Sequence, residues 1–364
     1  MVNKATSIVK QSRNEIVDVL RGIAMLMVVL GHTMTGCTDG AYDSFLYNVI
    51  WSIQMPLFIL ISGFVTKYSR GIESGKKLAK YIVRRSLSYL LPWIVWTILI
   101  RGIVFSKKQF LDFKWLLWHM DSGYWFLVTI WTISMVFGFS AFFAHIIAHK
   151  RDIEPLILFL FYITGMGGLV AIGHCVGYSF LSIKLTIYYM PFFFVGYLIG
   201  HYSDRVMKIQ RICIISECLI AVSLVAWISI LSLYNLFSMA DSGKTVVLRG
   251  FCSFTGCLAV CGLIYRAFCE QNAPKKCKTL LCWCGSHSLE IYVTHYLFLN
   301  IFKSERLPSV WSIEGVALTI INFAFALLAV AVIIGLFDYN RVLKFLLYGK
   351  LPHNQSKSSD QVTG

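Results

Sequence analysis

Three ionisable side chains lie in one apolar stretch near the start of the chain. Asp18, Arg21 and His32 belong to the segment "DVLRGIAMLMVVLGH", whose other residues suit a membrane-spanning helix. On a helix, eleven residues return to within about 20° of the starting direction and rise by roughly 16 Å, so Arg21 and His32 share one face at different depths. A charged side chain in hydrocarbon is costly, and such residues usually face a bundle interior and serve a function.

This spacing suits an elongated anionic ligand that lies along the helix. The planar guanidinium of Arg21 can hold phosphate oxygens, and Asp18, about one turn earlier, can orient it. The imidazole of His32 can take the proton of an attacking hydroxyl, since its ordinary pKa of about 6.5 suits general-base catalysis. Acyl-coenzyme A has such a shape, with phosphates at one end and a thioester at the other. The alternative is that both side chains reach the membrane surfaces and only anchor the helix.

The composition of the chain indicates the elements that must position these groups. Of the 364 residues, 57% are hydrophobic and 14% are charged, and the mean hydropathy is +0.68. A soluble domain of this size cannot bury so much apolar surface, whereas a bilayer accepts it in helices of about 20 residues. We therefore expect an all-α polytopic membrane bundle of about ten transmembrane helices, over residues 17–35, 45–66, 86–105, 124–147, 155–173, 185–202, 212–233, 247–268, 286–303 and 313–337.

The distribution of basic residues predicts how the bundle is oriented. If the N-terminus is cytoplasmic, 23 of the 33 lysines and arginines fall in inner segments and 8 in outer loops. This bias satisfies the positive-inside rule, so we expect both termini in the cytoplasm of a multi-pass protein of the bacterial plasma membrane. The net charge of +15 then indicates attraction to membrane lipid and not to nucleic acid. A transmembrane domain over 15–348 is expected between a cytoplasmic tail at 1–14 and a disordered cytoplasmic tail at 349–364.

The cysteines indicate neither disulfides nor a metal site. Most of the eleven fall in expected spans or in the cytoplasmic segment "CKTLLCWCGSH", where thiols stay reduced. The spacing of Cys277, Cys282, Cys284 and His287 in that segment matches no common ligand pattern. We expect free thiols and no bound metal.

Four stretches occur in an order that resembles one family, the integral-membrane acyltransferases of type 3, which include sugar O-acetyltransferases. "DVLRGIAMLMVVLGH" is similar to the first helix of that family, in which an Arg, ten residues and a His follow an Asp. "MPLFILISGFV" at 55–65 resembles the second helix of the family, and "YWFLVTIW" at 124–131 resembles its Trp-Phe-Leu element. "LEIYVTHYLF" at 289–298 resembles its late Ile-Tyr-x-x-His element.

The resemblance implies transfer of an acyl group, usually acetyl, from cytoplasmic acyl-coenzyme A to a hydroxyl of an extracytoplasmic acceptor. Acetyl-CoA would be a co-substrate, with no permanently bound cofactor. By position, His32 matches the essential histidine of the family and Arg21 its paired arginine. Family members often carry an Arg-x-x-Arg pair at the start of the third helix, but here Leu87 and Ser88 stand where a second arginine would fall. The candidate donor-binding residues are therefore Arg85, Arg84 and Lys80, although the positive-inside bias accounts for the same charges.

Three further residues are candidates for the acceptor site. Trp125 offers an indole face on which a sugar ring can stack, although an anchor at the membrane interface is a similar alternative. Tyr292 and His295 are one helical turn apart and can face the same cleft. The alternative for His295 is a hydrogen bond between helices.

The predicted function is that of a membrane O-acyltransferase acting on an envelope or exported saccharide or on a glycolipid. One alternative is a polytopic transporter or flippase without bond-making chemistry, because it too needs many helices and buried ionisable groups. Another is a regulatory protein that keeps the fold without activity, although the intact Arg21 and His32 pair argues against it. The acceptor, the choice between acetyl and succinyl, and the oligomeric state are left open by the sequence.

Overall fold

The structure, a computed structural model, describes residues 15–69, 71–120, 123–148, 153–202, 213–270 and 274–350. Within these ranges the chain is helical, with one isolated bridge between Asp39 and Ser309 and no strand. The all-α prediction is confirmed. Of the two predicted tails, residues 1–14 and 351–364 lie outside the described residues.

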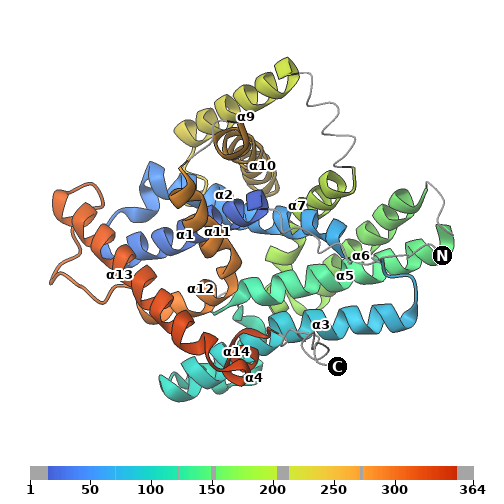
Figure 1. The fold of residues 1–364 in the computed structure, drawn as a ribbon, viewed down its shortest axis with the longest axis horizontal. Coiled ribbons are helices and arrows are strands. Elements are labelled where there is room, and N and C mark those ends of the chain that lie inside the picture. The colour runs from blue at the N-terminus through green and yellow to red at the C-terminus, as the bar shows by residue number, and fades with distance from the viewer. Residues whose placement is uncertain are drawn as a thin grey trace, which may run out of the picture.

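Figure 1 shows long helices packed around a central group that includes the first two. The long helices are α1 (Glu15–Cys37), α2 (Phe45–Phe64), α3 (Gly75–Ile94), α5 (Trp125–Ala148), α6 (Glu154–Val176), α7 (Ile183–His201), α9 (Cys213–Leu233), α10 (Gly243–Tyr265) and α13 (Ile313–Asp338). The shorter elements used below are the π-helix η3 (Val95–Val104), the 3-10 helices η4 (Lys108–Leu111) and η8 (His295–Leu297), and α4 (Phe113–Trp118), α11 (Lys275–Ser286), α12 (Ser288–Thr294) and α14 (Arg341–Tyr348).

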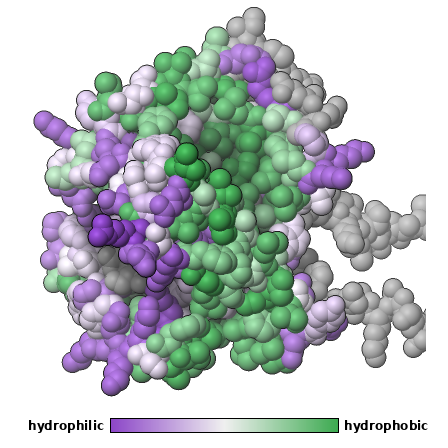
Figure 2. Space-filling model, turned by 90° about the vertical axis from the view of Figure 1, so that its left-hand side faces the viewer, coloured by the Kyte–Doolittle hydropathy of each residue, from purple (hydrophilic) through white to green (hydrophobic). Residues whose placement is uncertain are grey.

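Eight helical segments in the described part of the chain are long and apolar enough to cross a membrane, and each coincides with a predicted span. They are Glu15–Cys37, Phe45–Tyr68, Gly75–Val104, Trp125–Ala148, Glu154–Val176, Phe180–His201, Gly243–Phe268 and Ile313–Asp338. Figure 2 shows the corresponding surface, a broad hydrophobic band with hydrophilic residues along its sides. Such an apolar belt needs lipid around it, so the chain is a multi-pass membrane protein.

The two other predicted spans differ from expectation. The span at 212–233 corresponds to α9, whose apolar part in the described residues, Glu217–Leu233, is shorter than the other spans. The prediction of one continuous helix over 286–303 is wrong. The chain breaks at His287 between α11 and α12, narrows into the 3-10 helix η8 at His295, and then turns at Asn300, whose φ is +56°. This broken segment lies inside the bundle, where side chains from neighbouring helices can satisfy the freed backbone groups.

The third predicted span is longer than expected and changes its winding. The prediction began at residue 86, whereas the helix begins at Gly75, after Ser74, whose side chain accepts a hydrogen bond from the Lys77 N–H. Beyond Pro92, which cannot donate a backbone hydrogen bond, the helix continues as the π-helix η3. Such wide turns often occur at functional sites.

The contact between α1 and α11 positions the first helix, and Figure 1 shows the two side by side. Gly22 of α1 lies against the Leu281 carbonyl, and Gly285 of α11 lies against the Asp18 carbonyl. A Cβ atom at either glycine would collide with backbone, so both glycines permit the close approach. Small residues serve this purpose at helix interfaces in membranes.

Candidate active site

His32 points into the bundle near the end of α1. Its side chain is half-buried, and its Nε2 shares a hydrogen bond of 2.9 Å with the hydroxyl of Tyr296 in η8. The two rings are 4.9 Å apart between centroids. The break that starts η8 therefore brings a phenol to the imidazole that the sequence singled out.

His295 lies beside this pair and is fully buried. Its ring centroid is 5.5 Å from that of His32 and 4.2 Å from that of Tyr296. Its Nδ1 lies 3.0 Å from the Ile291 carbonyl oxygen, which can only accept, so Nδ1 carries the proton. In the neutral ring Nε2 then holds a lone pair, and it has no hydrogen-bond partner among the described residues. A buried acceptor without a donor is costly, and it suits a site that receives a hydroxyl group.

An arginine reaches the same cluster from the π-helix. The guanidinium carbon of Arg101 lies 5.5 Å from the ring centroid of Tyr296, 5.7 Å from that of Tyr124 and 4.7 Å from that of Phe110. A cation over aromatic faces is attracted to them, which holds the guanidinium in place. The cluster thus has a fixed positive charge over the ring of Tyr296, the residue that contacts both imidazoles.

Aromatic rings complete the walls of the cluster. Tyr124 donates a hydrogen bond of 2.9 Å to the Val293 carbonyl, which ties the start of α5 to α12. Tyr292 is buried, and its ring lies 6.1 Å from His295, 5.9 Å from Tyr124 and 5.6 Å from Phe126. Tyr292 and His295 therefore lie side by side in this cluster, and their role in the acceptor site stays a prediction. A dry aromatic surround strengthens electrostatic interactions inside it.

Asp18 and Arg21 lie near the other end of α1. The helix is continuous from Glu15 to Cys37, so the axial separation of Arg21 and His32 is the roughly 16 Å that the spacing predicted. Asp18 is buried, with its backbone against Gly285, and Arg21 is half-buried. The segments that meet α1 at its two ends, α11 and η8, belong to the same broken stretch of chain.

The three candidate donor-binding residues on α3 face different ways. Arg85 is half-buried, donates a hydrogen bond of 3.2 Å to the Tyr89 hydroxyl and has its guanidinium carbon 5.2 Å from the Tyr81 ring. Arg84 and Lys80 are exposed. Of these three, Arg85 is the one held inside the protein, and the predicted donor contact of each stays a prediction.

Trp125 packs differently from the predicted sugar platform. Its indole is half-buried and stacks on Tyr189 of α7, with 5.8 Å between ring centroids and 15° between planes. One indole face is therefore covered by a neighbouring ring. At the start of α5 it is Tyr124, and not Trp125, that contacts the ring of Tyr296. The acceptor role of Trp125 stays a prediction.

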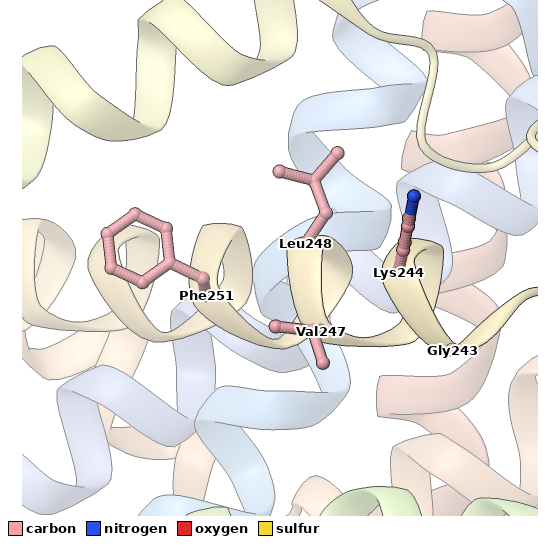
Figure 3. A pocket seen from close by; sticks show the side chains of 5 residues that line it. All are labelled: Gly243, Lys244, Val247, Leu248 and Phe251. Atoms are coloured by element: carbon pink, nitrogen blue, oxygen red, sulfur yellow. The ribbon is translucent and has the colours of Figure 1, made fainter.

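Two cavities are lined by other residues. One, of about 590 Å³, lies along α10, and Figure 3 shows its side chains Lys244, Val247, Leu248 and Phe251, three of which are apolar. Such a surface suits lipid tails. The other, of about 360 Å³, lies where α2, α3, α5, α6 and α7 end or begin, and is lined in part by Tyr81, His145 and His201. Tyr81 is also a neighbour of Arg85.

Sequence reasoning missed two members of the cluster, Tyr296 and Arg101. Tyr296 stands next to His295 in "IYVTHYLF", but a helix of regular pitch would have turned adjacent side chains apart. In the structure the rings of both residues nevertheless lie near His32, with centroid separations of 5.5 Å for His295 and 4.9 Å for Tyr296. Arg101 had a signal, since it is a basic residue at the far end of a predicted span, against the positive-inside trend.

Comparisons with known proteins show the family to which the chain belongs. A family model described as an acyltransferase domain matches residues 14–337, so the chain belongs to this acyltransferase family and the resemblance seen in the sequence is confirmed. The chain is also similar to nodulation protein NolL of Mesorhizobium japonicum, with 29% identity over 103 residues. That match covers 26% of this chain and 27% of the relative, so it spans about a quarter of the curated protein. No solved structure matches the chain.

Proposed function

We propose that this protein is a membrane O-acyltransferase that moves an acyl group, acetyl by preference, from cytoplasmic acyl-coenzyme A to a hydroxyl of an envelope or exported saccharide or glycolipid. The proposal places the protein in the plasma membrane of a bacterium, with both termini in the cytoplasm. Membership of the acyltransferase family supports the reaction class. The observation that carries the proposal is the contact of His32 with Tyr296 and with the fully buried His295, whose Nε2 is an acceptor without a partner among the described residues.

The reaction would proceed in one displacement. The reacting hydroxyl of the acceptor gives its proton to His32 as its oxygen attacks the thioester carbonyl carbon, while a neighbouring hydroxyl of the acceptor donates a hydrogen bond to Nε2 of His295. The carbon–sulfur bond then breaks, and coenzyme A leaves as a thiolate that recovers the proton from His32. Proton transfer by a positioned imidazole contributes roughly 10²- to 10⁴-fold to such reactions.

The surrounding residues would assist this displacement. The fixed charge of Arg101 stabilises the negative charge that develops on the carbonyl oxygen, a contribution of about 10²- to 10³-fold in comparable sites. Arg21, with Asp18 beside it, and Arg85 hold the phosphates of the donor. The two substrates would meet at His32 after entering from opposite sides of the membrane.

The test is a comparison of envelope glycans and glycolipids from cells with and without the protein, by mass spectrometry. Acetyl transfer to a hydroxyl adds 42 Da, the difference between an acetyl group and the hydrogen it replaces, and alkali should remove this mass. The result would identify the acceptor at the same time. Unchanged glycan masses, together with altered export of an unmodified glycan, would favour the transporter alternative and contradict the proposal.

A further inference from the structure

A buried carboxylate at the start of α12 has an unfilled hydrogen-bonding position. The side chain of Glu290 is 1% exposed, and its Oε1 forms an ion pair with the Nζ of Lys350. Its Oε2 has no hydrogen-bond partner in the part of the chain that the structure describes. Because the lysine neutralises the carboxylate, the unfilled position suits a neutral donor better than a second cation.

A second unfilled polar group lies on α14. Tyr348 is buried, its ring stacks on Trp96 with 6.3 Å between centroids, and its hydroxyl has no hydrogen-bond partner within the described ranges. Trp96 also donates a hydrogen bond of 2.8 Å to the Leu347 carbonyl, which fixes α14 against η3. Burial, followed by the neighbouring Glu290 and Asp338 carboxylates, raises the pKa of Tyr348, so its hydroxyl stays protonated and able to donate.

The backbone after α14 brings these groups together. Gly349 ends the helix with φ at +62°, and it lies against the Leu87 carbonyl of α3 so closely that a Cβ atom would collide with it. Glycine adopts this left-handed conformation without steric cost. The turn directs Lys350 to Glu290 and to the Ser286 carbonyl, which lies 3.5 Å from its Nζ. The predicted tail at 349–364 therefore begins with two residues that are packed into the bundle.

One free acceptor and one free donor match a secondary amide. An amide N–H can donate to Glu290 Oε2, and the amide carbonyl can accept from the Tyr348 hydroxyl. Leaving both groups unpaired in a dry interior costs free energy that such a ligand would recover. The arm of coenzyme A contains two secondary amides between the thioester sulfur and the phosphates.

The distance of Glu290 from His295 along the helix axis fits the amide that is farther from the sulfur of coenzyme A. Glu290 and His295 are five residues apart, a rise of about 7.5 Å along a helix. Seven bonds separate the sulfur from that amide nitrogen, which is about 8 Å for an extended chain. We propose that Glu290 and Tyr348 bind this amide of the pantetheine arm while the thioester lies at His32 and His295. This inference rests on the proposed function, because it takes acyl-coenzyme A as the donor.

The test is binding of two ligands to the purified full-length protein in nanodiscs, by calorimetry. Coenzyme A carries the arm, and 3′-phosphoadenosine 5′-diphosphate is the same nucleotide without it. Tyr348→Phe removes the hydroxyl and keeps the ring that stacks on Trp96. We expect this variant to bind coenzyme A about 5- to 10-fold more weakly and to bind the nucleotide as the wild type does. The matched control is Tyr339→Phe, whose ring is 92% exposed.

A modified ligand gives a second measurement that needs no variant. A coenzyme A analogue with an ester in place of that amide lacks the N–H, and the wild type should bind it several-fold more weakly than coenzyme A. Two results would overturn the amide assignment and leave the proposed function intact. One is equal affinity of wild type and Tyr348→Phe for coenzyme A. The other is an equal loss of affinity of the variant for coenzyme A and for 3′-phosphoadenosine 5′-diphosphate. Equal affinity of the wild type for coenzyme A and for the ester analogue would also overturn the amide assignment, and it would indicate that water alone occupies the position between Glu290 and Tyr348. Failure of the wild type to bind coenzyme A at all would overturn the proposed function as well.

Discussion

Two arginines on one continuous helix meet tyrosines in different ways. Arg85 lies in the regular part, α3, and contacts Tyr81 and Tyr89, four residues to either side on the same helix. Arg101 lies in the π-helical part, η3, and contacts Tyr124 of α5 and Tyr296 of η8. The first contact follows from helical spacing alone, whereas the second exists only once three distant segments have packed together.

The difference separates a local site from an assembled one. The surroundings of Arg85 are present as soon as α3 forms, which suits a contact that holds one end of a ligand. The surroundings of Arg101 depend on the break before η8 and on the start of α5, and they include Tyr296, which shares a hydrogen bond with His32. We therefore assign chemistry to the assembled cluster around Arg101 and ligand binding to the local surroundings of Arg85, and separate substitutions can test each assignment.

The largest effect is expected at the imidazole of the assembled cluster. His32→Ala should lower the rate of acyl transfer by about 10³-fold, because it removes the proposed general base. The measurement is transfer of labelled acetyl from acetyl-CoA by protein in nanodiscs. His174→Ala, which removes an exposed histidine from α6, is the matched control and should keep full activity. Equal activity of His32→Ala and this control would contradict the catalytic assignment.

Arg101→Met should have the next largest effect. Removing the positive charge beside the tyrosines should lower kcat by about 10²-fold with little change in the donor KM, because the charge acts on the transition state. Lys107→Met removes an exposed cation six residues further on and serves as the control. A rise in KM at unchanged kcat would instead make Arg101 a binding residue.

Arg85→Met should show the opposite pattern. Loss of a charge-assisted contact to a donor phosphate should raise the KM for acetyl-CoA by about 10-fold and leave kcat nearly unchanged. Arg84→Met, at the exposed neighbouring position, should change neither constant by more than about 2-fold. If the two variants behave alike, the inward contact of Arg85 has no special role and the positive-inside explanation suffices.

The smallest effect is expected at Asp241, which pairs with a third arginine, Arg249, in a region without proposed chemistry. Arg249 and Lys184 contact the exposed carboxylate of Asp241, and these hydrogen bonds hold the pKa of Asp241 below its ordinary value. A carboxylate with a lowered pKa stabilises the fold above its unfolded pKa of about 3.9, and this contribution disappears as the pH falls. Asp241→Asn should lower the Tm by about 1 °C at pH 7 and by progressively less as the pH falls below about 3.9, measured by thermal scans. A deficit of the same size at pH 7 and at pH 2 would contradict this assignment.

Much of the bundle could be predicted from hydropathy, because each long apolar run must form its own hydrogen bonds in lipid and therefore becomes a helix. The segment at 286–303 could not be predicted in this way. Its apolar residues resemble those of a span, but its backbone is broken where neighbouring helices surround it. Hydropathy records the affinity of side chains for lipid and carries no information about such internal breaks.

The same limit applies to the candidate site. His32 and Arg21 could be paired because they share one helix, and Tyr292 and His295 because they are one turn apart. The contacts of His32 with Tyr296, and of Tyr296 with Arg101, join residues that are far apart in the sequence. No periodicity of one chain encodes these contacts, so only the packed structure could supply them.

The most direct measurement of the central claim is a double-mutant cycle on kcat for His32 and Tyr296, whose side chains share a hydrogen bond of 2.9 Å. Tyr296→Phe should slow acetyl transfer about 10-fold when His32 is present and not at all in the His32→Ala background, because the hydroxyl acts through the imidazole. Equal losses in both backgrounds would show that the two residues act independently and would contradict the account.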